Sequence, residues 1–195
     1  METSLPNTEI SELQRRIAVY EDETAYRKLF TLLYLPLKQF STGFLRAAES
    51  AEEVVSDVFM EIWRRRSELM AIEDLKVYMY ICVRNGSLRK LQQLKKDATL
   101  SLDDFGYEFT SNYISPEDAI LTSELSQRIQ SVINDLPPRC KLVYKLAKED
   151  KLHYKDISAI LNISIKTVDS HLATALHRIA AAINFKLKKD TGTVI

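Results

Sequence analysis

Glycine and proline are scarce in this chain, with four glycines and five prolines among 195 residues. Stretches in which apolar and polar residues alternate are also scarce, which argues against β-strands. Long runs with helical periodicity are present instead. We therefore predict an all-α protein, built as two small helical domains joined by a flexible linker, with a helix-turn-helix in the C-terminal domain.

Cysteines, long apolar runs and a signal peptide are also few or missing. The two cysteines, Cys82 and Cys140, have apolar helical surroundings and no partner at short spacing, so we predict reduced core thiols rather than a disulfide or metal pair. No apolar run approaches the roughly 20 residues that span a bilayer. The N-terminus METSLPNTEISELQ lacks a basic segment followed by an apolar core. We expect a cytoplasmic protein without membrane insertion.

The chain carries no net charge, because 27 basic residues balance 27 acidic ones. The charges are nevertheless segregated: residues 75–97 carry net +5 and residues 139–195 carry net +6, whereas residues 98–124 contain six acids and no Lys or Arg. Basic segments attract phosphates and acidic ones repel them. The pattern suggests two DNA contacts separated by a segment kept off the DNA, although each block could also be a solvated face.

The most informative segment is residues 154–179, YKDISAILNISIKTVDSHLATALHRI. Its apolar spacing predicts two short helices. Between them, Asn162 tolerates the left-handed conformation that ends a helix, and Ser164 is a natural N-cap. In the second helix we predict a buried stripe of Ile165, Val168, Leu172, Leu176 and Ile179. The residues expected to face outward are Lys166, Thr167, Asp169, Ser170 and His171.

Short polar and basic side chains on the first turns of such a second helix suit base-edge and phosphate contacts in a major groove. The segment therefore predicts DNA binding. An ordinary helical hairpin with a solvated face would show a similar pattern, so the motif alone leaves this alternative open.

Further helices are predicted upstream, at residues 22–40, 50–69 and 75–95. Residues 97–113 have no helical period and are interpreted as a linker. Ser115-Pro116-Glu117 begins another helix with an N-cap and a proline at its first position, and a short helix at 139–148 precedes the helix-turn-helix.

Two of these helices carry candidate binding groups. In residues 50–69, Phe59 and Trp63 are most simply core residues, but aromatics beside acids can also form a protein-docking surface. In residues 75–95, Lys76, Tyr80 and Arg84 align opposite a predicted core stripe of Leu75, Met79 and Cys82. Aromatic rings interleaved with cations suit single-stranded DNA, although a solvated amphipathic helix would look much the same.

The ordered combination of AEEVVSDVFMEIWRRRSEL, DLKVYMYICVRN, SPEDAI and LPPRCKLVYKLAKEDKLHYKDISAILNISIKTVDSHLATALHRI resembles the extracytoplasmic-function sigma factors of bacterial RNA polymerase. The resemblance covers about residues 17–185. It implies a first domain at 17–97 that binds core polymerase and the −10 promoter element. It also implies a linker at 98–114 and a second domain at 115–187 that binds the −35 element.

The resemblance also implies roles for individual residues. Those expected to contact core polymerase are Glu53, Asp57, Phe59 and Trp63. Those expected at the −10 element are Lys76, Tyr78, Tyr80, Arg84 and Asn85. Those expected at the −35 element are Tyr154, Lys155, Lys166, Thr167, Ser170 and His171. The chain departs from the family at Arg89, where Asp is common, at Asn162, where Gly is usual, and at Ser158, where Ala is common.

The implied mechanism is binding without covalent chemistry, so no catalytic residue, cofactor or metal ion is expected. The partners implied are core polymerase, promoter DNA and a restraining anti-sigma factor. A response-regulator-type transcription regulator is the main alternative, and the helical segment at 20–95 speaks against it. An enzyme using His153, His171 and His177 is a remote alternative, since these residues have no metal-ligand or triad spacing.

Overall fold

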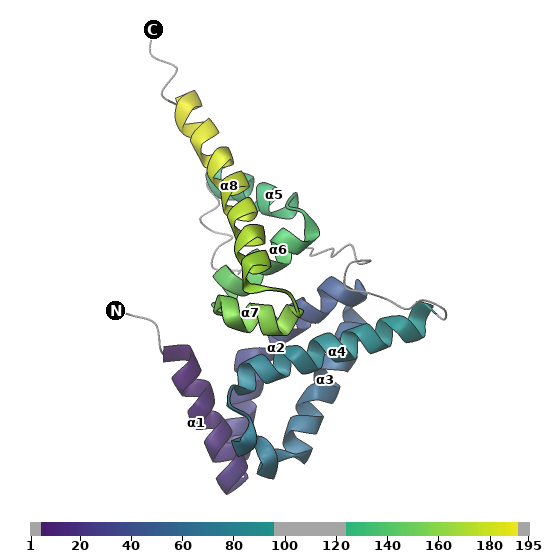
Figure 1. Cartoon of the computed structure of the whole chain (residues 1–195). Helices are drawn as coiled ribbons and strands as arrows, with labels where there is room; N and C mark the ends of the chain where they lie inside the picture. The colour runs from purple at the N-terminus through teal and green to yellow at the C-terminus, as the bar shows by residue number, and fades with distance from the viewer. Residues whose placement is uncertain (1–4, 96–123, 191–195) are drawn as a thin grey trace. The chain divides into compact units, whose positions relative to one another are not determined.

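The computed structural model describes residues 5–95 and 124–190, and within these ranges it contains helices and no β-strand (Figure 1). This confirms the all-α prediction. The chain divides into two compact units, lying mainly in residues 1–105 and in residues 106–195. The predicted linker and the predicted helix start at Ser115 lie outside the described residues.

The described part of the N-terminal unit contains four α-helices and one 3-10 helix. They are α1 (Leu5–Tyr20), α2 (Glu23–Leu45), α3 (Ala48–Arg64), η1 (Arg66–Ala71) and α4 (Leu75–Lys95). The side chain of Asp22 caps α2, because its Oδ1 accepts from the backbone N–H groups of Thr24 at 2.9 Å and Ala25 at 3.0 Å. The helix then continues through Pro36 and ends at Leu45, and the C-cap residue Arg46 adopts the left-handed conformation.

Helix α1 was not predicted from the sequence. Its residues Ile10, Leu13 and Ile17 are buried, so residue 17, the predicted domain start, lies inside a packed helix. The buried amide of Gln14 donates to the carbonyls of Leu69 and Ile72, both at 2.7 Å. These bonds fix α1 against the end of η1, where the Leu69 carbonyl also accepts from the backbone N–H of Ile72.

The core of this unit lies where α2 meets α3 and α4. The ring of Phe40 makes edge contacts with Phe44 and Tyr80, with centroids 5.1 Å apart in both pairs. Gly86 of α4 allows close approach to α3, because a Cβ at this position would lie 2.9 Å from Cγ1 of Val54. Helices α3 and α4 are thereby held close together along part of their length.

The C-terminal unit contains the predicted helix-turn-helix. Its elements are α5 (Glu124–Asn134), α6 (Pro138–Tyr144), a π-helical turn η4 (Lys145–Glu149), α7 (Tyr154–Leu161) and α8 (Ile165–Asp190). Pro138 is the first residue of α6, one position before the predicted helix start at 139. A core cluster of Ile133, Leu136, Cys140, Ala175 and Ile179 joins α5 and α6 to α8.

Candidate functional site

The turn between α7 and α8 is held by its own side chains. Asn162 has φ 55° and ψ 48°, the left-handed conformation predicted for it. The hydroxyl of Ser158 donates to the carbonyl of Ile163 at 2.6 Å, which gives a local reason for serine at this position. Ser164 Oγ accepts from the backbone N–H of Thr167 at 3.0 Å, so the predicted N-cap is confirmed.

The buried stripe of α8 differs from the predicted one. Val168, Leu172, Ala175 and Ile179 are buried, whereas Ile165 is 51% exposed and Leu176 is also exposed. The prediction that Ile165 and Leu176 belong to the core is therefore wrong. An apolar side chain at the start of the helix faces solvent instead.

The predicted −35 residues on α8 fall into two groups. Lys166 and Ser170 are exposed, and their side chains make no hydrogen bond or ion pair within the described residues. Thr167 is half-buried, and its hydroxyl lies 2.7 Å from Ser164 Oγ. The first pair is available to a ligand, whereas Thr167 contributes to the cap.

His171 is half-buried, and its Nδ1 lies 3.6 Å from Sγ of Cys140 on α6. Burial, together with the nearby positive charge of Arg139, lowers the pKa of His171 below its ordinary value of 6.5. The imidazole is therefore neutral at pH 7. The predicted outward orientation is corrected for this ring, because Nδ1 faces the interior of the unit. Cys140 is buried, as predicted.

Tyr154 and Lys155, the other predicted −35 residues, occupy the first two positions of α7. Both are exposed. Exposed phenol and ammonium groups at a helix start can reach a phosphate, which is the contact that the resemblance implied for them.

On α4, Arg84 and Asn85 form one arrangement. The Nη2 and Nε atoms of Arg84 donate to Oδ1 of Asn85 at 3.0 and 3.2 Å. A guanidinium only donates, so the carbonyl oxygen of the Asn85 amide is engaged and its NH₂ group remains as a donor. Arg84 thus determines that Asn85 presents its NH₂ group, and not its carbonyl oxygen, to a ligand.

Tyr80 does not lie on the exposed face of α4. It is 0% exposed and packs against Phe40, so the prediction that it contacts DNA is wrong. The buried stripe of α4 runs through Leu75, Met79, Tyr80, Val83, Ser87 and Leu91. Cys82, predicted to be a core residue, is half-buried, and Lys76 is half-buried as well.

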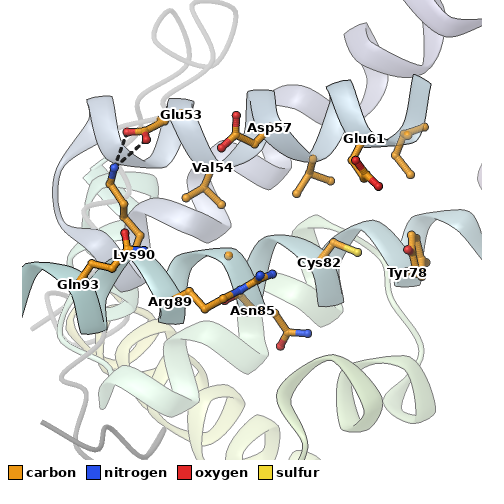
Figure 2. Close-up of a pocket in the computed structure, with 13 residues that line it drawn as sticks. Glu53, Val54, Asp57, Glu61, Tyr78, Cys82, Asn85, Arg89, Lys90 and Gln93 are labelled. Carbon is orange, nitrogen blue, oxygen red and sulfur yellow. Dashed lines mark hydrogen bonds and ion pairs between the residues drawn. The ribbon is translucent and has the colours of Figure 1, made fainter. Parts of the chain in front are cut away.

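A groove of about 580 Å³ separates α3 from α4 within the N-terminal unit (Figure 2). The α3 wall carries Glu53, Asp57 and Glu61, and the α4 wall carries Tyr78, Cys82, Asn85, Arg89, Lys90 and Gln93. Lys90 Nζ lies 2.7 Å from both carboxylate oxygens of Glu53 and joins the two walls. A hydrogen bond to Cys82 raises the pKa of Tyr78, which remains a neutral phenol.

Of the predicted polymerase-binding residues, Phe59 and Trp63 lie in an aromatic cluster between α2 and α3, whereas Glu53 and Asp57 line the α3–α4 groove. Phe59 is 2% exposed, so the prediction that its own ring contacts polymerase is wrong. Trp63 is half-buried and lies 4.9 Å from the ring of Tyr26. Glu53 and Asp57 are exposed, as a docking role requires.

Residues of α2 complete this cluster, and the sequence analysis had not assigned them a role. The ring of Phe30 lies 4.7 Å from those of both Tyr34 and Phe59, and Phe30 remains 37% exposed. On α3, Met60 is also exposed. We call Tyr26, Phe30, Tyr34, Phe59 and Trp63 the α2–α3 aromatic cluster. Their spacing of four residues along two helices was the available sequence signal.

The known proteins that this chain resembles are sigma factors. Residues 126–179 match the model for "Sigma-70, region 4". The chain is 25% identical over 174 residues to the ECF RNA polymerase sigma factor SigW of Bacillus subtilis, covering 86% of this chain and 91% of SigW. It is 26% identical over 148 residues to SigM of the same bacterium, covering 75% and 87%. The chain is thus similar to extracytoplasmic-function sigma factors over most of its length.

Solved structures agree in fold. The structure of CnrH in complex with the cytosolic domain of CnrY matches with a TM-score of 0.52 at 16% identity, covering 91% of this chain and 96% of CnrH. The sigma factor RpoE of Bartonella quintana, in complex with the anti-sigma factor NepR, matches with a TM-score of 0.51 at 18% identity, covering 82% and 96%.

These similarities support an alternative sigma factor, a transcription initiation factor that directs RNA polymerase to promoters. The response-regulator alternative is not favoured, since the described part of the upstream segment is helical throughout rather than α/β. Within the described residues, no helix is long and apolar enough to cross a membrane, and no group of three or more potential metal ligands occurs.

Proposed function

We propose that this sigma factor contacts promoter DNA through two surfaces, one on each unit, and core polymerase through a third. Residues 17–97 would carry the polymerase and −10 functions, residues 115–187 the −35 function, and residues 98–114 would link them. The observation that carries the proposal is the helix-turn-helix, whose second helix leaves Lys166 and Ser170 exposed and unpartnered.

The −35 surface is the exposed face of α7 and α8. Lys166 and Ser170 lie four residues apart on α8, so both can point into a major groove, where Lys donates to guanine acceptors and Ser bonds to any base. Tyr154 and Lys155 would contact phosphates and set the register of the helix. Thr167 and His171 support this surface through the cap and the packing on Cys140.

The −10 surface is the outer part of α4. The free NH₂ group of Asn85 would donate to an acceptor of an unstacked base, and Arg84 is a positioning residue for that amide. Tyr78 offers a half-buried ring two turns earlier on the same wall of the groove, and Lys76 supplies a cation for the backbone. Capture of an unstacked base costs a few kcal/mol, which the new stacking and hydrogen bonds offset.

Core polymerase would dock on the α2–α3 aromatic cluster and on the acids of α3 that line the neighbouring α3–α4 groove. Phe30, Trp63 and Met60 supply exposed apolar area, and Asp57 and Glu53 supply orientation. Phe59 would not contact polymerase itself, but its buried ring packs against the ring of Phe30 and supports it. The proposed docking surface therefore still includes the predicted segment of α3, but its contacting side chains are Phe30, Trp63 and Met60 rather than Phe59.

The proposed setting is the cytoplasm, where polymerase and promoters are found, and the proposed restraining partner is an anti-sigma factor. The structures of CnrH and RpoE were solved with the cytosolic domain of CnrY and the anti-sigma factor NepR, respectively. The fold match supports a partner of this class for the present chain. The proposed activity consists of binding and promoter opening, without covalent chemistry or a cofactor.

A reconstituted system tests the proposal. The full chain is mixed with bacterial core polymerase, and the complex is isolated by gel filtration and used for run-off transcription on genomic fragments. We expect co-elution with core and transcripts whose upstream sequences share two elements. A Lys166→Ala variant should lose −35 binding, and an Asn85→Ala variant should lose promoter opening more than duplex binding.

Two results would contradict the proposal. Failure of the protein to co-elute with core polymerase would rule out the sigma-factor mechanism for this chain. Unchanged transcription by the double variant Lys166→Ala/Asn85→Ala would contradict the assignment of both DNA-binding surfaces. The free protein should bind promoter duplex weakly, because its net charge is zero.

A further inference from the structure

Asp169 is an acid on the DNA-facing side of α8. It is exposed, and it forms no hydrogen bond or ion pair through its side chain within the described residues. It lies four residues after the exposed Ile165 and three after Lys166, away from the buried stripe of Val168, Leu172 and Ala175. A carboxylate here requires an explanation, because phosphates repel it.

The usual structural reasons for an acid near a helix start do not apply to Asp169. An acid in the first turn stabilises a helix through the dipole, but Asp169 is the fifth residue of α8. The cap of the helix is already provided by Ser164. Lys166, three residues earlier, does not pair with it. The fold of the unit therefore places no demand on this carboxylate.

The chemistry of base edges indicates what the carboxylate can bind. A carboxylate only accepts hydrogen bonds. In the major groove guanine presents two acceptors, and thymine presents an acceptor and a methyl group. Adenine offers an amino donor beside the N7 acceptor, which would repel the second oxygen. Cytosine offers its N4 amino group without an acceptor on the same base edge.

We propose that Asp169 is a specificity-determining residue that selects cytosine within the −35 element by accepting a hydrogen bond from its N4 amino group. The inference rests on the proposed −35 role of α8. Lys166, on the adjoining strip, is a donor suited to guanine, and the exposed Ile165 can contact a thymine methyl group. The helix thus presents an acceptor, a donor and an apolar group close together.

The assignment is tested with holoenzyme formed from the full chain and core polymerase. The −35 segment of a promoter that the wild-type holoenzyme transcribes is randomised, and the transcribed variants are sequenced. The wild type should enrich cytosine at one −35 position by roughly tenfold over the other bases. Asp169→Asn should lose this preference or move it to adenine, and Asp169→Arg should move it to guanine.

Asp135→Asn is the matched control, because it removes one exposed carboxylate from the loop between α5 and α6. It should select the same −35 bases as the wild type. If all four proteins select the same bases, the assignment of Asp169 is overturned while the sigma-factor function stands. If the wild-type holoenzyme transcribes every −35 sequence equally, the −35 role of α8 fails, and the inference falls with it.

Discussion

The N-cap of α8 provides the sharpest test of how local structure supports promoter binding. Ser164→Ala removes the oxygen that accepts from the Thr167 N–H at 3.0 Å and leaves one orphan donor at the start of α8. Loss of a serine cap costs about 1 kcal/mol. Since 1.4 kcal/mol corresponds to a factor of ten, the open first turn becomes about fivefold more populated.

This number also limits the effect on DNA. Apparent affinity falls only by the fraction of molecules whose first turn is formed, so −35 binding should weaken by at most about fivefold. Hydrogen exchange of the amides at the start of α8 should increase by a similar factor. Both are measured on the full chain, with holoenzyme anisotropy on a promoter duplex for the affinity.

Ser164→Asp separates the cap from the DNA contact. Aspartate caps as well as serine, so the exchange rates should stay near those of the wild type. Its charge, however, would meet the phosphates if the start of α8 enters a major groove, and holoenzyme binding should weaken. Unchanged exchange in Ser164→Ala would refute the cap argument. Wild-type DNA affinity in Ser164→Asp would refute the placement of α8.

Three further predictions concern single side chains. Tyr80→Ala should destabilise the N-terminal unit by about 3 kcal/mol or more, seen as a lowered Tm, whereas Tyr154→Ala, at a tyrosine that is 39% exposed, should leave Tm unchanged. Phe30→Ala should weaken binding to core polymerase about tenfold by titration, and Leu32→Ala, equally exposed on α2 at 38% but outside the α2–α3 aromatic cluster, should not. Because the pKa of folded His171 is below the ordinary 6.5, its neutral packing stabilises the fold above pH 6.5, and this contribution should be lost as pH falls below that value. The pH dependence of unfolding in urea should flatten in His171→Gln.

The helix-turn-helix could be predicted accurately because its signals are local. Asn162 and Ser164 act on backbone groups within a few residues of themselves, so no knowledge of the tertiary structure is needed. The sequence analysis missed α1 although Ile10, Leu13 and Ile17 have helical spacing. The buried amide of Gln14 was beyond prediction, because its partners lie 55 and 58 residues away.

The errors on α3 and α4 have two different causes. Helix α4 packs against both α2 and α3, so apolar and aromatic residues occur on several of its sides and periodicity cannot tell which stripe is buried. Tyr80 was therefore placed outside although it is buried, and Cys82 was placed in the core although it is only half-buried. Phe59 was correctly recognised as a candidate core residue. Its role in docking was then taken from the family resemblance. Such a resemblance indicates which segment contacts polymerase, but it does not indicate in which direction a particular ring points.

The two DNA surfaces differ in how far they are arranged before binding. On α4, Arg84 holds the Asn85 amide in one orientation, so little side-chain freedom is lost when a base arrives. On α8, the Lys166 side chain is unrestrained and would be ordered only on contact. Duplex DNA exposes its base edges without any free-energy cost of opening, so the flexible Lys166 side chain suffices at the −35 element. An unstacked base carries an opening cost of a few kcal/mol, so a preset donor matters more at the −10 element.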